Sequence, residues 1–240
     1  MQSARSDRQH SRTEPAAFDE VAHRLHGVRF TTPGNGRVLY DFILDHGIED
    51  ILEIGFHHGA STCYMAAALA ERGSGHIVTL DHQISRDKVP NLPQLLDDFG
   101  FAEYVTPVFA ERSYTWELHR LLAGAVTDQR DRQQFDFMFH DADHTWDGTS
   151  LAFFLGDLML RPDGWMLFDD YRWTIQASKT AMHQPRGQWP EEERRTAAVR
   201  EVFRLLIGPH PGYREPILTN NGNWAWVRKR EHETMDDRIP

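Results

Sequence analysis

The stretch ILEIGFHHGASTCYMAAALAERG, residues 51–73, contains the first clear structural unit of the chain. Its opening residues, ILEIG, form a short apolar run, which is typical of a strand buried on both faces of a parallel sheet. The segment 60–73 has an alanine-rich face and ends at Gly73, as a helix does. We therefore predict a strand, a glycine turn and a helix over residues 51–73.

The same alternation continues along the chain. Further strands are predicted at 76–81, 104–110, 135–141 and 164–170, with helices at 92–100, 114–124 and 149–164. Strands separated by helices predict βαβ units, whose right-handed crossovers place helices on both faces of a parallel sheet. The segment 214–230 contains the turn signal Asn221-Gly222 and predicts a β-hairpin. The expected fold is α/β: a Rossmann-like, doubly wound, mainly parallel seven-stranded sheet with a C-terminal antiparallel hairpin.

The remaining segments define the predicted domain organisation. Residues 1–32 are interpreted as an N-terminal arm with a short helix, and 33–240 as a single domain. The sequence PGNG at 33–36 is interpreted as a break, followed by a helix over 38–47. Another helix is predicted near the C-terminus, from Pro190 to Gly208. Residues 171–189 lack a clear period. They are expected to form a lid over the substrate, with an ordinary surface loop as the alternative.

Composition limits the partners. The formal net charge is −10 at pH 7, which disfavours nucleic acid and favours a neutral or cationic small molecule or a bound cation. Cys63 is the only cysteine, so no internal disulfide is possible and a cytoplasmic location is expected. The sequence has no apolar run of ~18 residues and no apolar leader, so no membrane association is expected. A homodimer is expected on general grounds.

The glycine turn carries the first candidate site. Gly55 and Gly59 allow a ligand to approach the backbone, but their G-x-x-x-G spacing is not the G-x-G-x-x-G of dinucleotide sites. Glu53 lies inside the strand, where a carboxylate suits a ligand that carries an ammonium group. Asp81 ends the next strand, where an acid accepts ribose hydroxyls. A nucleoside site is favoured over the alternative, a plain turn beside a solvated acid.

A second candidate site lies in FHDADHTWDG (139–148) and FDDY (168–171). Asp141 ends one predicted strand and Asp169-Asp170 end the next, so these acids should lie roughly 5 Å apart, the spacing of neighbouring strands. Three clustered carboxylates repel one another, and a divalent cation removes that cost. Oxygen ligands favour Mg²⁺, with Mn²⁺ or Ca²⁺ as substitutes. His140 and His144 also have an H-x-x-x-H spacing, but they do not lie on a helix, so zinc is disfavoured.

Four motifs in order, LEIGFHHGAST, TLDH, FHDADH and FDDY, carry a family resemblance. The chain resembles the class I S-adenosylmethionine-dependent methyltransferases over residues 33–230. Within them it is similar to the metal-dependent O-methyltransferases: catechol O-methyltransferase and the cephamycin and macrocin-type enzymes. The resemblance implies transfer of a methyl group from S-adenosyl-L-methionine to a hydroxyl of a small molecule, in a setting such as natural-product biosynthesis.

The resemblance also implies roles for individual residues. The predicted cofactor-binding residues are Glu53, Gly55 and Gly59 at the methionine part, Asp81 at the ribose and Ser113 at the adenine. Ser61 and His140 are also predicted to belong to the cofactor site, His140 as a strand-end residue near the adenine. The predicted metal ligands are Asp141, Asp169 and Asp170. Catechol O-methyltransferase has a lysine base three residues after its first metal acid, and this chain has His144 there. Because histidine is a good base near neutral pH, His144 is predicted to be the catalytic base. Asp141, which would hold the metal, is the second predicted catalytic residue.

Three other functions remain open. The first is methyl transfer to oxygen or nitrogen without a metal, with His144 acting alone. The second is a fold relative that binds the nucleoside for a role other than methyl transfer. A nicotinamide dehydrogenase is the least favoured, because the glycine spacing differs from that of dinucleotide sites.

Overall fold

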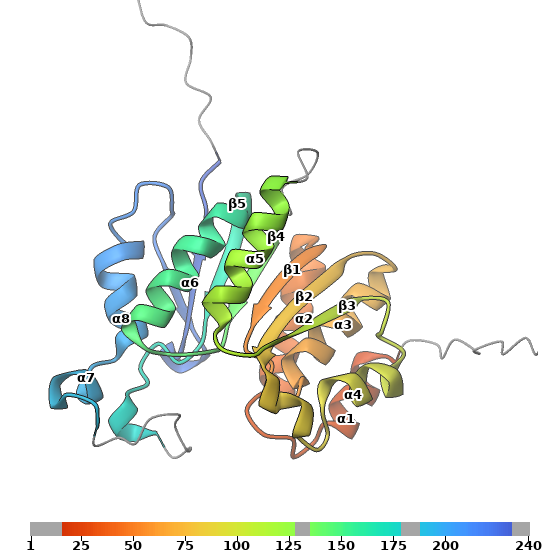
Figure 1. The fold of residues 1–240 in the computed structure, drawn as a ribbon. Coiled ribbons are helices and arrows are strands. Elements are labelled where there is room, and N and C mark those ends of the chain that lie inside the picture. The colour runs from red at the N-terminus through yellow and green to blue at the C-terminus, as the bar shows by residue number, and fades with distance from the viewer. Residues whose placement is uncertain (1–15, 128–134, 179–187, 232–240) are drawn as a thin grey trace, which may run out of the picture.

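One sheet of seven strands forms the centre of the computed structural model, which describes residues 16–127, 135–178 and 188–231 (Figure 1). The strand order is β3-β2-β1-β4-β5-β7-β6. The strands are β1 (Asp50–Ile54), β2 (His76–His82), β3 (Val105–Ala110), β4 (Phe135–His140), β5 (Leu160–Phe168), β6 (Ile217–Thr219) and β7 (Trp224–Arg228). Strands β1 to β5 pair in parallel, whereas β7 pairs antiparallel with β5 and β6. The predicted fold, including the C-terminal hairpin, is confirmed.

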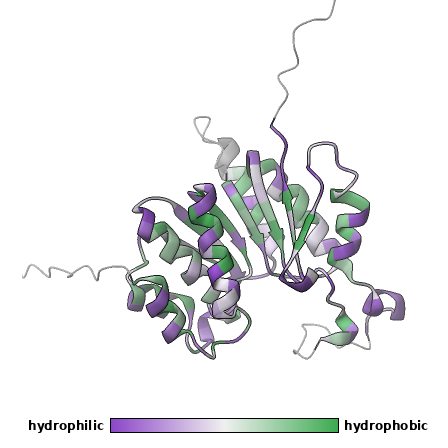
Figure 2. Cartoon of the chain, turned by 180° about the vertical axis from the view of Figure 1, so that it is seen from behind, coloured by the Kyte–Doolittle hydropathy of each residue, from purple (hydrophilic) through white to green (hydrophobic). Residues whose placement is uncertain are grey.

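Helices cover both faces of the sheet. The helices are α1 (Phe18–Arg24), α2 (Pro33–His46), α3 (Ala60–Arg72), α4 (Leu92–Phe99), α5 (Tyr114–Thr127), α6 (Trp146–Met159), α7 (Glu191–Arg195) and α8 (Ala198–Val202). Ile51 and Phe137 pack with residues of α1 to α4, while their strand neighbours Leu52 and Met138 pack with α5, α6 and α8. This alternation follows from the two-residue period of a strand. Hydrophobic residues accordingly concentrate on the strands and on the inner sides of the helices (Figure 2).

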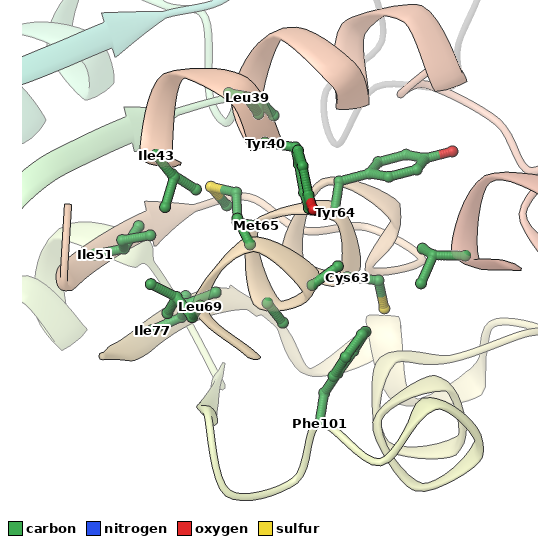
Figure 3. Packing of buried hydrophobic residues seen from close by; sticks show 14 of the residues in the cluster. Leu39, Tyr40, Ile43, Ile51, Cys63, Tyr64, Met65, Leu69, Ile77 and Phe101 are labelled. Atoms are coloured by element: carbon green, nitrogen blue, oxygen red, sulfur yellow. The ribbon is translucent and has the colours of Figure 1, made fainter. Parts of the chain in front are cut away.

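The predicted break at PGNG is wrong, because these residues form the first turn of α2. The Thr32 side chain caps the helix by accepting the Asn35 N–H at 3.2 Å, and Pro33 takes the first helical position, where no N–H is needed. Gly36 lies against the ring of Tyr64, and a Cβ at Gly36 would come within 2.3 Å of that ring. The glycine therefore lets α2 approach α3 closely in the core around Tyr64 (Figure 3).

Two other boundaries differ from the predictions. The predicted helix 149–164 ends at Met159, and β5 starts at Leu160, earlier than the predicted residue 164. The predicted helix 190–208 is divided into α7, α8 and a short π-helical turn, Phe203–Ile207. Thr196 interrupts it with an extended backbone, and Ala197 is also non-helical. Residues 1–15 of the predicted N-terminal arm and residues 179–187 of the predicted lid lie outside the described residues.

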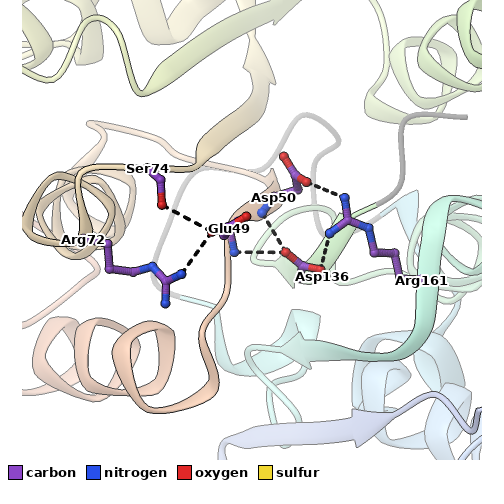
Figure 4. A network of polar contacts seen from close by, with 6 residues as sticks. All are labelled: Glu49, Asp50, Arg72, Ser74, Asp136 and Arg161. Carbon is purple, nitrogen blue, oxygen red and sulfur yellow. Dashed lines mark hydrogen bonds and ion pairs between the residues drawn. The ribbon is translucent and has the colours of Figure 1, made fainter. Parts of the chain in front are cut away.

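A polar network holds the amino ends of the central strands (Figure 4). The Asp136 carboxylate accepts the backbone N–H groups of Glu49 at 3.0 Å and Asp50 at 2.9 Å. Arg161 donates to Asp136 and to Asp50, both at 2.6 Å. These contacts tie β1, β4 and β5 together at the edge opposite their carboxyl ends.

The candidate residues of both sites lie at the carboxyl ends of the strands, where ligands bind in open α/β sheets. Within the described residues, no helix is both long and apolar enough to cross a bilayer.

Candidate active site

The glycine turn after β1 packs tightly on its neighbours. Gly55 and Gly59 have φ angles of 92° and 97°, which L side chains rarely adopt. A Cβ at Gly55 would lie 2.3 Å from the Asp141 carbonyl oxygen, and one at Gly59 would lie 2.6 Å from Leu92 Cδ1. The two candidate sites predicted from sequence are therefore in contact through Gly55 and Asp141. The role of the two glycines in cofactor binding stays a prediction.

Glu53 is fully buried beneath this turn. Its carboxylate accepts hydrogen bonds from Ser61 Oγ at 2.5 Å, Thr79 Oγ1 at 2.6 Å and the Thr62 hydroxyl. Burial raises the pKa of Glu53 to about 7, although the three hydroxyl donors oppose the shift. Glu53 and Ser61 thus bond to each other in this structure. The contact of Glu53 with the methionine part and the cofactor-binding role of Ser61 stay predictions.

Asp81, the predicted ribose acid, has four hydrogen-bond donors around it. One carboxylate oxygen accepts the backbone N–H groups of Phe56, at 3.1 Å, and His57, both in the glycine turn. The other accepts the His82 N–H at 2.6 Å and the Tyr114 hydroxyl at 3.1 Å. Sequence reasoning did not identify Tyr114, whose position directly after Ser113, the predicted adenine residue, was the only available signal.

The two predicted adenine residues have different surroundings. Ser113 lies at the start of α5, where its Oγ accepts the Trp116 N–H at 3.2 Å. His140, the last residue of β4, is 1% exposed and its ring stacks on Phe168 at 5.3 Å between centroids. Burial lowers the pKa of His140 to about 3, so the ring is neutral. Contact of either residue with adenine stays a prediction.

The structure brings the three predicted metal acids together with His144. Asp141 follows β4 and Asp169 follows β5, and the Asp169 N–H donates to the His140 carbonyl at 3.0 Å, which continues the strand pairing. His144 Nε2 lies 3.3 Å from Asp170 Oδ2 and 3.7 Å from Asp141 Oδ1. The predicted base therefore lies between two of the predicted metal acids.

Asn223, from the C-terminal hairpin, completes this cluster. Its side-chain amide donates to Asp169 Oδ1 at 3.1 Å and to Asp170 Oδ1 at 3.2 Å. Asp170 itself has a φ of 57°, a left-handed conformation that an aspartate tolerates better than most residues. Asn223 was not predicted to be a site residue, because only the antiparallel pairing of β7 with β5 brings it to this edge of the sheet.

The cluster carries more negative charge than its neighbours neutralise. Burial, followed by the charges of Asp169 and Asp170, raises the pKa of Asp141 well above its ordinary value. Burial and the charge of Asp170 raise the pKa of Asp169 to about 7. Burial lowers the pKa of His144, although Asp170 and Asp143 favour its protonated form. Across residues 16–127, 135–178 and 188–231, no three His, Cys, Asp or Glu side chains have their donor atoms arranged to hold a metal ion.

Asp143 belongs to the turn that starts α6. Its carboxylate accepts the Thr145 hydroxyl at 3.0 Å, and its carbonyl accepts the Thr149 hydroxyl at 3.2 Å. Thr145 caps α6 by accepting the Gly148 N–H at 3.2 Å. Asp143 therefore has a structural role in the position of His144, the next residue.

A cavity of about 700 Å³ lies beside His144. Its walls come from the segments that follow β2, β3 and β4, including the first turns of α5 and α6, and from the predicted lid. The lining residues are His82–Ile84, Ala110–Thr115, Asp143–Thr145, Asp147, Trp173, Ser178 and Trp189. The Trp173 ring lies 5.5 Å from that of His144. The cavity thus connects the surroundings of Asp81 with the candidate base, and an apolar wall faces that base.

Comparison with known proteins gives one family and several similar folds. A family profile described as a methyltransferase domain matches residues 52–171. No curated protein sequence matches the chain.

Three solved structures illustrate the similarity of fold. An O-methyltransferase from Bacillus cereus in complex with S-adenosylhomocysteine has a TM-score of 0.61 and 19% identity, with 89% of this chain and 90% of that one covered. The O-methyltransferase TomG from Streptomyces achromogenes, involved in tomaymycin synthesis and in complex with S-adenosylmethionine, has a TM-score of 0.60 and 18% identity, with 91% of each chain covered. The MycE methyltransferase of the mycinamycin biosynthetic pathway, in complex with Mg and S-adenosylhomocysteine, has a TM-score of 0.57 and 18% identity, with 94% of this chain and 57% of that one covered.

Proposed function

The chain belongs to the family of methyltransferase domains that matches its residues 52–171, and we propose that it is an S-adenosylmethionine-dependent, Mg²⁺-dependent O-methyltransferase that acts on a hydroxyl group of a small molecule. The observation that carries this proposal is the position of His144. Its Nε2 contacts Asp141 and Asp170, and its side chain lines the cavity that also reaches the surroundings of Asp81. A base that contacts two of the acids thus lies on a cavity that reaches His82 and Tyr114, the neighbours of Asp81.

The methyl donor would bind at the glycine turn and Asp81. S-adenosylmethionine carries an activated sulfonium, so the protein has to position the acceptor and remove its proton. Gly55 and Gly59 present no side chain at their two positions in the turn, and Asp81 offers the carboxylate that suits a ribose diol. Similar folds from Bacillus cereus and Streptomyces achromogenes hold S-adenosylhomocysteine and S-adenosylmethionine, which supports this donor.

His144 would act as the general base. Burial lowers its pKa, which favours the neutral, proton-accepting imidazole, while the adjacent Asp170 stabilises the imidazolium that forms on proton transfer. The Trp173 ring would pack against the acceptor and place its hydroxyl near His144. TomG and MycE act in natural-product synthesis, and we extend that setting to the acceptor of this chain.

Asp141, Asp169 and Asp170 would hold Mg²⁺, or Mn²⁺ in its place. Burial, and after it the repulsion between these carboxylates, raises the pKa values of Asp141 and Asp169, and their oxygens are the hard donors that Mg²⁺ prefers. Such an ion, when bound, orients a hydroxyl group and lowers its pKa. The presence of Mg in the MycE complex supports this choice of metal. Asn223 would fix the orientation of Asp169 and Asp170.

A second candidate is methyl transfer to oxygen or nitrogen without a metal. The contacts of His144 with Asp141 and Asp170 favour it, because a protonated imidazole there would itself supply the cation that the acids lack. The two candidates differ in their response to chelation. Only the metal-dependent enzyme loses activity in EDTA and regains it with Mg²⁺.

The proposal is tested by the release of S-adenosylhomocysteine from S-adenosylmethionine with a panel of small hydroxylated acceptors. We expect turnover in the wild type and a loss of about 10²-fold or more in His144→Gln, since general-base catalysis contributes that much. His119→Gln, an exposed histidine outside the site, is the matched control and should keep full turnover. Absence of S-adenosylhomocysteine with every acceptor, or full activity of His144→Gln, would contradict the proposal.

A further inference from the structure

Tyr114 bonds to the carboxylate that the proposed function assigns to the ribose. It is the first residue of α5, and its hydroxyl donates to Asp81 Oδ1 at 3.1 Å. Burial and the charge of Asp81 both raise the pKa of Tyr114, so the hydroxyl keeps its proton and remains a donor. The ring lies 4.3 Å from that of His82, the residue that follows Asp81. Tyr114 therefore makes a polar contact and a ring contact at the end of β2.

The Asp81 carboxylate has no free acceptor site in this arrangement. Each of its oxygens accepts two donors: Phe56 N–H and His57 N–H on one, and His82 N–H and the Tyr114 hydroxyl on the other. A carboxylate offers about four lone-pair sites, so these donors fill it. A ribose diol needs at least one of those sites. Its binding therefore requires one of the present donors to leave.

Only one of the four donors can leave without movement of the backbone. The N–H groups of Phe56, His57 and His82 belong to the main chain of the glycine turn and of the end of β2. The Tyr114 hydroxyl belongs to a side chain, which can rotate about its own torsions. Tyr114 also lines the cavity of about 700 Å³, so its ring has space to move into.

We propose that the Tyr114 side chain closes the nucleoside site of the free protein, and that binding of the cofactor exchanges the Tyr114 hydroxyl on Asp81 for a ribose hydroxyl. Tyr114 is then a gating residue. The bond between Tyr114 and Asp81 has to break before the nucleoside binds, so a stronger bond gives a weaker affinity for the nucleoside. This inference rests on the proposed function, because it takes Asp81 as the ribose acceptor.

The test is the dissociation constant of S-adenosylhomocysteine, measured by isothermal titration calorimetry for the full-length wild type and Tyr114→Phe. The variant keeps the ring but has no hydroxyl to displace, so we expect its dissociation constant to fall about 3- to 10-fold, which corresponds to one hydrogen bond. Tyr213→Phe is the matched control, since Tyr213 also donates to a carboxylate, that of Asp157 at 2.7 Å, but does not line the cavity. Its dissociation constant should equal that of the wild type.

The outcomes separate this inference from the proposed function. An unchanged or larger dissociation constant for Tyr114→Phe, with folding verified by circular dichroism, would overturn the gating role while the wild type still binds S-adenosylhomocysteine. Absence of binding by the wild type would overturn the proposed function, and the inference with it.

Discussion

His144 Nε2 lies 3.3 Å from Asp170 Oδ2, so the candidate base and one of the candidate metal acids are in direct contact. The two residues lie in the segments that follow the neighbouring parallel strands β4 and β5, at the same edge of the sheet. The contact joins both parts of the proposed chemistry, proton removal and cation binding, in one site. It also makes the balance between them measurable, because a metal ion and a protonated imidazole compensate the same carboxylates.

Metal removal tests this balance. We expect EDTA to lower turnover at least about 10-fold, and Mg²⁺ to restore it, because a bound cation stabilises the developing oxyanion by several kcal/mol. Mg²⁺ should also raise the melting temperature of the wild type, measured by differential scanning fluorimetry, since a ligand that binds only the folded state stabilises it. Asp169→Asn combined with Asp170→Asn should abolish both responses. Equal turnover of this variant and of the wild type in EDTA and in Mg²⁺ would show that no metal takes part.

The buried Glu53 gives a pH dependence of stability. Burial raises its pKa from 4.5 to about 7, so between these values the unfolded chain releases a proton that the folded chain keeps. The stability contributed by neutral Glu53 is therefore complete below pH 4.5 and is lost as the pH rises through 7. Relative to Glu53→Gln, which stays neutral, the wild type should lose about 2–3 kcal/mol of unfolding free energy between pH 5 and pH 8. Urea denaturation of both proteins measures this difference, and a difference independent of pH would contradict the account.

At Gly36, replacement of a helical glycine by alanine should destabilise the protein, whereas the same replacement elsewhere in a helix usually stabilises it. Glycine to alanine inside a helix normally stabilises by up to about 1 kcal/mol. At Gly36 the new methyl group would collide with the Tyr64 ring at 2.3 Å, so Gly36→Ala should destabilise by about 1–3 kcal/mol in thermal or urea unfolding. Gly34→Ala, where the nearest atom is 3.8 Å away, is the control on the same helix and should change stability by less than about 1 kcal/mol. Stabilisation by Gly36→Ala would show that α2 and α3 are not in close contact.

Two substitutions at Asp136 distinguish the stability that comes from its hydrogen bonds to backbone N–H groups from the stability that comes from its ion pair with Arg161. Asp136→Ala leaves the N–H groups of Glu49 and Asp50 without their acceptor and should cost about 1–3 kcal/mol. Asp136→Asn keeps an acceptor oxygen and loses only the charge that faces the partly exposed Arg161, so it should cost about 1 kcal/mol or less. Urea denaturation measures both values. An equal cost for the two variants would mean that the ion pair, and not the capping of the strand ends, holds this edge of the sheet.

Much of the fold and the grouping of the acids could be predicted from the sequence. Buried parallel strands appear as short apolar runs, and parallel strands end at one edge, so Asp141 and Asp169 were expected to be neighbours. The predicted PGNG break was wrong because Thr32 caps a helix that starts at Pro33, and Gly36 is needed inside that helix for its close packing on Tyr64. The helix after Pro190 was expected in one piece, but Thr196 divides it.

The remaining site residues could not be found from local patterns. Asn223 reaches Asp169 across 54 positions of sequence, and only because β7 pairs with β5. Tyr114 reaches Asp81 across 33 positions, through the placement of α5 beside the end of β2. Both contacts depend on tertiary structure and leave no periodic signal in the chain. The roles of the predicted cofactor and metal residues stay predictions until a ligand is bound.

A crystal structure of the chain grown with S-adenosylhomocysteine and Mg²⁺ tests the central claim most directly. We expect the ribose hydroxyls on Asp81 with the Tyr114 hydroxyl displaced, the homocysteine part beside Gly55 and Gly59, and the cation on Asp141, Asp169 and Asp170. S-adenosylhomocysteine bound elsewhere, or a cation absent from the three carboxylates while His144 still contacts Asp170, would contradict the account of a metal-dependent methyltransferase site.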